Sequence, residues 1–486
     1  MKVRDLLKKV RPVVVSGNRE VEVKNLHIDS RSVGPGDCFV AIQGSKVDGH
    51  EFIDQALKNG AKAVVAQREV SLPEVVTLFM VESSRKAWSE MACSLYENPS
   101  REIDLIGVTG TNGKTTVATL LHDLFTELGY RCGLISTNRN LIGNEEDAAT
   151  HTTPDPMELN GHLRRMVESG CEYAFMEVSS HALDQERTFG VRFAGAIFTN
   201  LSHDHLDYHG DFKSYLYAKK KLFDDLEPDT FALTNADDRN GNVMLQNCRA
   251  KKVSYGLYRN ADYKAKVVEN NIEGLQLEIE GHSIHFLLTG AYNASNLLGV
   301  YAAGRMMGFE EMELLTAMSA LRAPEGRLER VHDLTGKPAV FVDYAHTPDA
   351  LEKVLSALAG MKRMDQKLFV VFGCGGDRDV SKRPEMGRIA SRIADEVIIT
   401  SDNPRTEDPV AIIEDVAAGV ESGEVFKVRK ISSRQEAIKV ACQLAGNDDI
   451  VIVAGKGHEK YQDINGEKVP FDDKEIARKA LLSRAE

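Results

Sequence analysis

The sequence Gly110-Thr111-Asn112-Gly113-Lys114-Thr115-Thr116 lies between an apolar run, Asp104–Thr109, and a helical pattern from about Lys114 to Leu128. In the helical pattern, apolar side chains recur on one face at helical spacing. Glycines in such a loop let backbone N–H groups approach a phosphate closely, and the helix N-terminus adds positive potential. We therefore predict a strand–loop–helix unit that binds the phosphates of a nucleotide.

The loop is a shortened variant of the G-x-x-x-x-G-K-[ST] pattern, because that pattern needs glycine where this chain has Val108. In the standard loop, the lysine reaches the β- and γ-phosphates and a hydroxyl side chain ligates Mg²⁺. Lys114 and a neighbouring threonine are the candidates for these roles here. The alternative is a tight strand–helix turn that happens to carry a lysine, which the strand–loop–helix context disfavours.

Outward from this loop, short apolar runs alternate with polar turns and helical patterns, which predicts α/β architecture with mostly parallel sheets. We expect three blocks, 1–98, 99–327 and 328–486. Their expected elements are strands at Cys38–Ile42, Ala63–Ala66, Tyr173–Val178, Ala194–Thr199, Ala339–Val342, Leu368–Phe372, Glu396–Thr400 and Ile450–Val453, and a helix at Glu51–Asn59. Each strand of the third block runs into a polar loop, and ligands of open α/β sheets bind at such strand ends.

The composition bounds the class of protein. The chain has 486 residues, a formal charge of −13 and 42% hydrophobic residues, so a disordered chain or a general nucleic-acid binder is not expected. The seven cysteines are dispersed without a C-x-x-C pair, so we expect no disulfide framework and a cytoplasmic location. No signal peptide or membrane span is expected. Gly373–Arg378 ends in arginine where a dinucleotide fingerprint needs glycine, so no such site is predicted there.

Two acidic and histidine-rich stretches, Glu177–His181 and Ser202–His209, follow strands of the second block. Carboxylates and imidazoles at neighbouring strand ends can hold Mg²⁺ over phosphates. The same residue types could form a zinc site or only a hydrogen-bonded polar loop. The nearby phosphate loop favours magnesium. The run Lys219-Lys220-Lys221 is typical of a solvated helix face, and its spacing singles out none of the three.

At this point the sequence resembles the Mur ligases, a family of ATP-dependent, amide-forming enzymes of peptidoglycan precursor synthesis. The resemblance covers essentially the whole chain. It rests on Asp29-Ser30-Arg31, Gly110–Thr116, Thr152-Thr153-Pro154, Glu177–His181, Asp204–Gly210, Asp343–Pro348, Gly373–Asp379, Asp402-Asn403-Pro404-Arg405 and Gly455–Glu459. It implies a small N-terminal α/β domain for the uridine nucleotide, a central ATPase-like domain with a phosphate loop, and a C-terminal Rossmann-like domain for the amino acid.

The resemblance also implies site residues. Contacts to the UDP-muramoyl dipeptide would come from Ser30, Ser45, Lys46, Val47, Thr152, Thr153, Ser179, Gln185 and Arg187. ATP would be held by Gly110, Thr111, Asn112, Gly113, Lys114, Thr115, Thr116, Asn293, Asn296, Arg327, Asp343 and His346. The implied Mg²⁺ ligands are Thr115, Glu177, His205 and Lys219, the last as an anionic carbamate. We expect Lys114, Glu177, His205 and Lys219 to carry the catalysis.

The match is greatest to family members that add meso-diaminopimelate. Its extra carboxylate, absent from lysine, suits the planar guanidinium of Arg405. The resemblance assigns Arg378, Asp402, Asn403, Pro404, Gly455 and Glu459 to the same amino acid. The alternative to this binding role is that Arg405 is only a surface arginine beside a helix. Three other functions compete with this one: a lysine-adding ligase, a folate polyglutamylating ligase and a non-catalytic ATP-binding protein. Asp29-Ser30-Arg31 and Arg405 argue against the folate enzyme.

We expect the protein to be a monomer.

Overall fold

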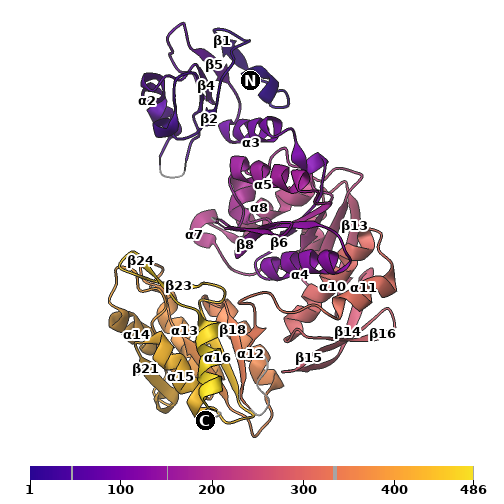
Figure 1. Ribbon diagram of the computed structural model, residues 1–486, viewed down its shortest axis with the longest axis vertical. Helices are drawn as coiled ribbons and strands as arrows, with labels where there is room; N and C mark the ends of the chain where they lie inside the picture. The colour runs from indigo at the N-terminus through magenta and orange to yellow at the C-terminus, as the bar shows by residue number, and fades with distance from the viewer. Residues whose placement is uncertain (45–46, 150, 332–336, 485–486) are drawn as a thin grey trace. The chain divides into compact units, whose positions relative to one another are not determined.

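The computed structural model describes residues 1–44, 47–149, 151–331 and 337–484. It divides into two compact units (Figure 1). The first unit comprises Met1–Tyr263 and Ala302–Gly308, and the second comprises Lys264–Tyr301 and Phe309–Glu486. Each unit has its own buried core and is described by itself.

The N-terminal part of the first unit holds a five-stranded sheet. Its strands lie in the order β1 (Val14–Ser16), β5 (Thr77–Met80), β4 (Ala63–Ala66), β3 (Cys38–Val40) and β2 (Leu26–His27), all parallel except β1. Helix α2 (Ile53–Lys58) packs on one face and α3 (Ser84–Leu95) on the other. The predicted helix from Glu51 begins instead as a 3₁₀ turn, Gly49–Phe52, because Asp48 caps that turn.

The central sheet of the first unit carries the phosphate loop. Its strands lie in the order β13 (Lys251–Gly256), β12 (Phe231–Asn235), β11 (Gly195–Phe198), β6 (Asp104–Thr109), β10 (Tyr173–Glu177), β7 (Cys132–Ile135), β8 (Arg139–Ile142) and β9 (Glu145–Ala148). The strands from β13 to β7 pair in parallel, and the pairings of β7 with β8 and of β8 with β9 are antiparallel. Helix α4 (Lys114–Glu127) covers one face, where Phe125 packs edge-on against Phe175. Helices α5 (Pro156–Glu168) and α8 (Phe212–Asp224) cover the other face.

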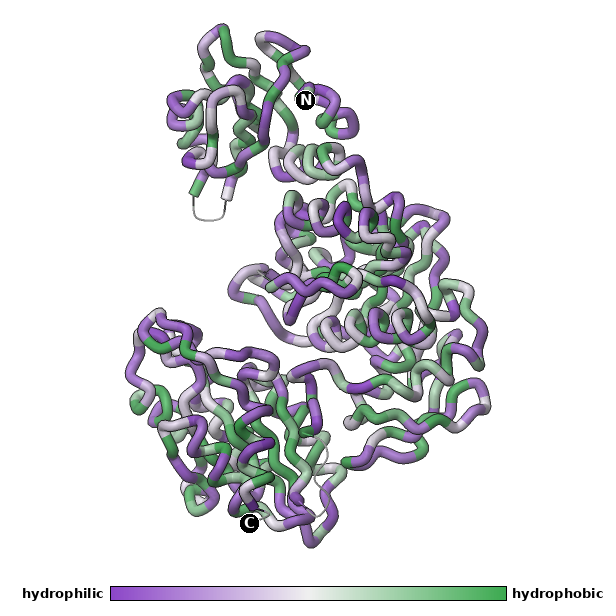
Figure 2. The backbone as a smooth tube through the Cα atoms, in the orientation of Figure 1, coloured by the Kyte–Doolittle hydropathy of each residue, from purple (hydrophilic) through white to green (hydrophobic). Residues whose placement is uncertain are grey.

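Residues 263–318, most of which belong to the second unit, form an antiparallel meander and two helices. These are β14 (Tyr263–Asn271), β15 (Gly274–Ile279), β16 (His282–Phe286), α10 (Ala291–Met306) and α11 (Glu311–Met318). A six-stranded sheet follows in the order β17 (Glu329–Arg330), β18 (Ala339–Asp343), β22 (Ile450–Ala454), β19 (Leu368–Phe372), β20 (Glu396–Thr400) and β21 (Val428–Ile431). Only β17 is antiparallel. Figure 2 shows the central strands of this sheet at the hydrophobic end of the scale, and they are fully buried.

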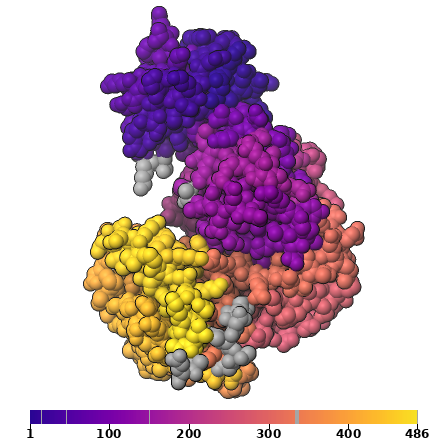
Figure 3. Space-filling view, in the orientation of Figure 1, coloured from indigo at the N-terminus to yellow at the C-terminus, as the bar shows by residue number. Residues whose placement is uncertain are grey.

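Helices cover both faces of the C-terminal sheet. Helices α12 (Pro348–Met361), α13 (Lys382–Ile393) and α14 (Pro409–Ala417) share one core, and α15 (Arg434–Leu444) and α16 (Asp473–Ser483) share the other. The outer side chains of α16 form part of the surface visible in Figure 3. A small hairpin, β23 (Tyr461–Ile464) and β24 (Glu467–Pro470), follows β22. The predicted α/β class, with parallel-rich sheets in the N-terminal, central and C-terminal regions, is confirmed.

Two further features bear on the predictions from composition. All seven cysteines are unpaired and buried. Among the described residues, no helix combines the length and the apolar character that crossing a membrane requires.

Candidate active site

The predicted phosphate loop joins β6 to α4, and the strand Asp104–Thr109 is confirmed residue for residue. Gly110 has φ +153°, and a Cβ there would lie 2.0 Å from Thr199 Oγ1, so only glycine fits. Lys114 Nζ donates to the carbonyl oxygens of Gly110, at 3.0 Å, and Thr111, at 2.8 Å. Thr115 and Thr116 lie buried in the first turn of α4. The Lys114 side chain therefore closes the loop by bonding to the carbonyls of its own residues.

The segment after β11 braces the phosphate loop, which the sequence did not predict. Asn200 Oδ1 accepts from the Asn112 amide at 3.0 Å, and Asn200 Nδ2 donates to the Asn112 carbonyl at 3.0 Å. Thr199 Oγ1 donates to the same carbonyl at 2.6 Å. The Tyr215 hydroxyl lies 3.0 Å from Thr111 Oγ1. A Thr-Asn pair directly after a strand neighbouring the loop strand was the available signal.

Lys219 lies against the phosphate loop. The prediction that Lys219, Lys220 and Lys221 form a solvated helix face is wrong for the first two, which are buried. Lys219 is completely buried; its Nζ donates to the Gly110 carbonyl at 2.8 Å and lies 4.7 Å from the centre of the Tyr215 ring. Lys220 is also buried and pairs with Asp224, and only Lys221 is partly exposed. Burial lowers the pKa of the Lys219 ammonium well below its usual value, and the charge of Lys114 lowers it further.

Glu177 ends β10 and His205 follows β11, the two strands that flank the loop strand β6 in the central sheet. Glu177 is buried at the end of β10, where its carboxylate accepts from the backbone N–H of Thr137 at 2.8 Å and from its hydroxyl at 3.2 Å. His205, at φ +53°, precedes the short helix α7 (Leu206–His209). Its ring packs edge-on against His181, with 4.9 Å between centroids. Burial lowers the pKa of the His205 imidazole.

Among the described residues, no metal site is built from acids, histidines and cysteines alone. Within the part of the chain that the structure describes, no three such side chains lie close enough together to hold a metal ion. Zinc requires three or four protein ligands of this kind, so the zinc alternative lacks support. Mg²⁺ keeps several waters and binds through one or two carboxylates plus substrate phosphates. The buried carboxylate of Glu177 beside a phosphate loop fits that mode.

The residues assigned to the dipeptide lie together next to Glu177. Thr153 Oγ1 donates to the Glu177 carbonyl at 2.8 Å and accepts from the Ser179 amide at 3.0 Å. Arg187 donates to the Thr153 carbonyl at 2.8 Å and to Gln185 Oε1 at 2.8 Å and 3.1 Å. Thr152 joins the cluster through the hydroxyl of Thr137, at 3.0 Å. Burial lowers the pKa of the Arg187 guanidinium, which is held by uncharged oxygens.

The residues assigned to the uridine nucleotide follow parallel strands of the N-terminal sheet. Ser30 is buried in the turn after β2, and its carbonyl accepts from Asn59 Nδ2 at 2.8 Å. Val47 is exposed after β3. Ser45 and Lys46 lie outside the described residues.

In the second unit, the residues assigned to ATP form two groups. Asn293 and Asn296 are buried on α10 and joined by a hydrogen bond of 2.9 Å. Asp343, at the end of β18, accepts from the backbone amides of Leu328 at 2.6 Å and Ala345 at 2.8 Å. In that second group, Arg327 lies 4.9 Å from the centre of the Tyr344 ring, and His346 Nδ1 lies 2.8 Å from the Tyr344 carbonyl.

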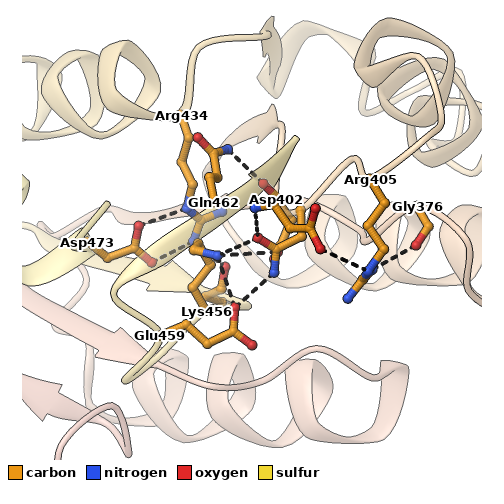
Figure 4. A network of polar contacts seen from close by, with 11 residues as sticks. Gly376, Asp402, Arg405, Arg434, Lys456, Glu459, Gln462 and Asp473 are labelled. Atoms are coloured by element: carbon orange, nitrogen blue, oxygen red, sulfur yellow. Dashed lines mark hydrogen bonds and ion pairs between the residues drawn. The ribbon is translucent and has the colours of Figure 1, made fainter. Parts of the chain in front are cut away.

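The loops after β19, β20 and β22 meet at the carboxyl edge of the C-terminal sheet, as predicted (Figure 4). Arg405, at φ +51°, donates from Nη1 to the Gly376 carbonyl at 2.7 Å, and its Nε lies 3.9 Å from Asp463 Oδ2. Its side chain is 26% exposed, so the alternative of a free surface arginine is not supported. Asn403 Nδ2 donates to Glu459 Oε2 at 2.9 Å.

The four other assigned residues also belong to these loops. A Cβ on Gly455 would lie 2.7 Å from Asp402 Oδ2, and a Cβ on Gly376 would lie 2.0 Å from the Pro404 carbonyl, so the loops pack through glycines. Arg378 is exposed and, among the described residues, its side chain makes no hydrogen bond or ion pair. The structure therefore brings Asp402, Asn403, Pro404, Arg405, Gly455 and Glu459 together and leaves Arg378 outside the network.

Comparison with known proteins gives the same family along the whole chain. Family models match at residues 22–94 ("Mur ligase family, catalytic domain"), 108–304 ("Mur ligase middle domain") and 326–457 ("Mur ligase, glutamate ligase domain"). The UDP-N-acetylmuramoyl-L-alanyl-D-glutamate--2,6-diaminopimelate ligase of Bacteroides fragilis is 47% identical over 98% of this chain and 99% of its own length. The ligase of the same name from Clostridium perfringens is 38% identical over 98% of each chain.

Solved structures agree. A structure of UDP-N-acetylmuramoyl-L-alanyl-D-glutamate--2,6-diaminopimelate ligase matches with a TM-score of 0.71 and 33% identity, over 100% of this chain and 99% of the other. The folylpolyglutamate synthase of Mycobacterium tuberculosis shares the fold, with a TM-score of 0.59 and 20% identity over 76% of this chain and 92% of its own. The chain belongs to the Mur ligase family.

Proposed function

We propose that this protein is an ATP-dependent ligase that joins meso-2,6-diaminopimelate to UDP-N-acetylmuramoyl-L-alanyl-D-glutamate through an amide bond. The relatives that bear this name match over nearly their whole length. The observation that carries the choice of amino acid is that Arg405 and Glu459 belong to one hydrogen-bonded set of loops: Arg405 donates to Gly376, Gly376 donates to Asn403, and Asn403 donates to Glu459. A guanidinium and a carboxylate in one such set suit a ligand end that has both a carboxylate and an ammonium.

The phosphate loop would hold ATP through the amides of residues 110–116 and the ammonium of Lys114. Thr115, Glu177 and His205 would hold Mg²⁺ with the phosphates, and the metal, when bound, would offset their negative charge. In the second unit, Asn293, Asn296, Arg327, Asp343 and His346 would contact the nucleotide.

Lys219 would act as a carbamate. A lysine whose pKa is lowered by burial presents a neutral amine, and that amine can add to carbon dioxide with loss of a proton. The product is an anion beside Gly110, where a bare ammonium would repel Lys114. Such an anion could join Glu177 in holding a cation over the phosphates.

The dipeptide carboxylate would be aligned by the cluster of Thr152, Thr153, Ser179, Gln185 and Arg187, and the uridine nucleotide by Ser30 and the loop that contains Val47. The carboxylate takes the γ-phosphoryl group of ATP and ADP leaves, which gives an acyl phosphate. The amine of diaminopimelate attacks the acyl carbon, phosphate leaves, and the amide remains. Lys114 would stabilise the charge that develops on the transferred group.

We further propose three domains, 1–98, 99–327 and 328–486, for the uridine nucleotide, ATP and the amino acid. The three larger sheets support this division, because their strands fall within residues 14–80, 104–286 and 329–454. We also expect a cytoplasmic monomer, which size-exclusion chromatography with light scattering would test.

Phosphate release with ATP, Mg²⁺ and the UDP-muramoyl dipeptide tests the function. Parallel reactions contain meso-diaminopimelate, L-lysine or neither. We expect release only with diaminopimelate. Release with lysine would keep the ligase but contradict the role of Arg405. Failure with both, after addition of bicarbonate to restore the carbamate, would favour a non-catalytic ATP-binding protein.

A further inference from the structure

Lys456 is a buried cation that none of the assignments above uses. It lies between Gly455 and Glu459, in the loop after β22, and its side chain is 0% exposed. Burying an ammonium is costly unless other groups pair with it. The partners of Lys456 therefore indicate why the chain keeps a charge there.

The partners are residues assigned to the incoming amino acid (Figure 4). Lys456 Nζ donates to Asn403 Oδ1 at 2.9 Å and to Glu459 Oε2 at 3.0 Å. Asp402 Oδ1 lies 3.9 Å away, and the centre of the Tyr461 ring lies 5.5 Å away. One ammonium thus contacts the loops after β20 and β22 at once.

These contacts fix the orientation of both polar side chains. Asn403 Oδ1 accepts from Lys456 and from the backbone amide of Asp463, at 2.9 Å, so its amide nitrogen must face Glu459. Glu459 receives both of its hydrogen bonds on Oε2. Among the described residues, Glu459 Oε1 has no hydrogen-bond partner, so this oxygen remains able to accept from a ligand ammonium.

Lys456 also balances the charge of the carboxylates around it. Asp402 and Glu459 are two carboxylates against one ammonium, which leaves one negative charge for a ligand cation to offset. Without Lys456, the two carboxylates would repel each other and Glu459 would lose the donor that orients it. Arg434 cannot replace it, because its guanidinium is bound in a buried pair with Asp473, at 2.7 Å and 2.8 Å.

We propose that Lys456 is a positioning residue that orients Glu459 and Asn403 to receive the ammonium of the incoming diamino acid. The inference rests on the proposed function. Lys456 acts through its neighbours and does not itself touch the substrate.

The test is steady-state kinetics of phosphate release by Lys456→Met. We expect the KM for diaminopimelate to rise roughly ten-fold or more, because a charge-assisted hydrogen bond that orients the carboxylate is lost. The KM for ATP and kcat should change less than about three-fold, since the phosphate site is untouched. Lys468→Met is the matched control, because Lys468 also lies over the Tyr461 ring, at 4.3 Å, and is expected to leave all three constants unchanged.

A double-mutant cycle separates positioning from general support of the fold. If Lys456 acts through Glu459, adding Lys456→Met to Glu459→Gln should raise the KM for diaminopimelate only about two-fold further. If Lys456→Met does not fold, Lys456→Gln, which keeps a hydrogen-bond donor, takes its place in the cycle.

Three outcomes would overturn the inference: an unchanged KM for diaminopimelate in a folded variant, equal effects in the two backgrounds, or a failure of both variants to fold. The wild-type protein distinguishes the inference from the proposed function. If it shows no diaminopimelate-dependent phosphate release, the function itself fails. If it does, a negative result with the variants counts against Lys456 alone.

Discussion

Lysines contact both the phosphate loop and the amino-acid loops, but they have opposite kinds of partner in the two places. Lys114 and Lys219 donate to one uncharged oxygen, the Gly110 carbonyl. Lys456 donates to the carboxylate of Glu459 and to Asn403. Two amines close together attract an anion, whereas a cation that is already paired with a carboxylate orients that carboxylate. The first arrangement suits a polyphosphate, and the second suits a ligand end with both charges.

The largest expected effect is the loss of the phosphate-loop cation. Lys114→Ala should lower kcat roughly 10³-fold, because charge on the transferred phosphoryl group loses its closest protein donor. Phosphate release measures the loss, and the melting temperature should show an intact fold. Lys221→Ala, which removes a lysine paired with Glu186 in the turn after α6 (Ser180–Asp184), is the control. Near-normal activity of Lys114→Ala would refute the phosphate-loop assignment.

The next effect concerns the second amine. Lys219→Gln should lower kcat roughly 10²-fold, because glutamine cannot form a carbamate and a group that helps to place the phosphates is lost. Wild-type protein depleted of carbon dioxide should regain activity on addition of bicarbonate, and the variant should not. A wild-type activity indifferent to bicarbonate would count against the carbamate.

A smaller and more selective effect is expected on the amino-acid side. Arg405→Ala should raise the KM for diaminopimelate roughly 10²-fold while the KM for ATP stays the same, because a charged hydrogen-bonding partner of one substrate is removed. Arg392→Ala, which removes an exposed arginine paired with Glu352, is the control. An unchanged KM for diaminopimelate would contradict the role of Arg405.

The smallest effect tests the brace of the phosphate loop. Thr199→Val removes the hydroxyl that donates to the Asn112 carbonyl, and one hydrogen bond of about 1 kcal/mol corresponds to a rise of about five-fold in the KM for ATP. Thr230→Val deletes a similar bond, to the Glu227 carbonyl, away from the loop. Equal effects of the two variants on the KM for ATP would show that Thr199 does not act on the loop.

Much of this arrangement could be predicted from the sequence. The apolar runs at Asp104–Thr109, Leu368–Phe372 and Glu396–Thr400 form strands with the predicted bounds, because buried parallel strands are short and continuously apolar. The helix predicted from Lys114 begins at that residue, because Gly113 takes a left-handed conformation just before it. Local pattern was sufficient for both.

The contacts across the sheets could not be predicted in this way. Thr199 and Asn200 reach the phosphate loop from almost ninety positions away along the chain, and Lys219 from 109. Three consecutive lysines look alike in sequence, yet tertiary packing buries Lys219 and Lys220 and leaves Lys221 partly exposed. Lys456 was overlooked because a lysine between glycines carries no periodic signal.

The seven buried cysteines have a practical consequence. Burial raises the pKa of Cys132 and Cys442 to about 12 and that of Cys93 and Cys374 to about 11, so few thiolates are available to react. The native thiols should therefore survive maleimide labelling of the folded enzyme. Cysteines introduced by Tyr258→Cys and Phe426→Cys, at positions 80% exposed in the first and second units, could then carry a pair of dyes. Energy transfer between the dyes would show whether the distance between the two units changes when substrates bind.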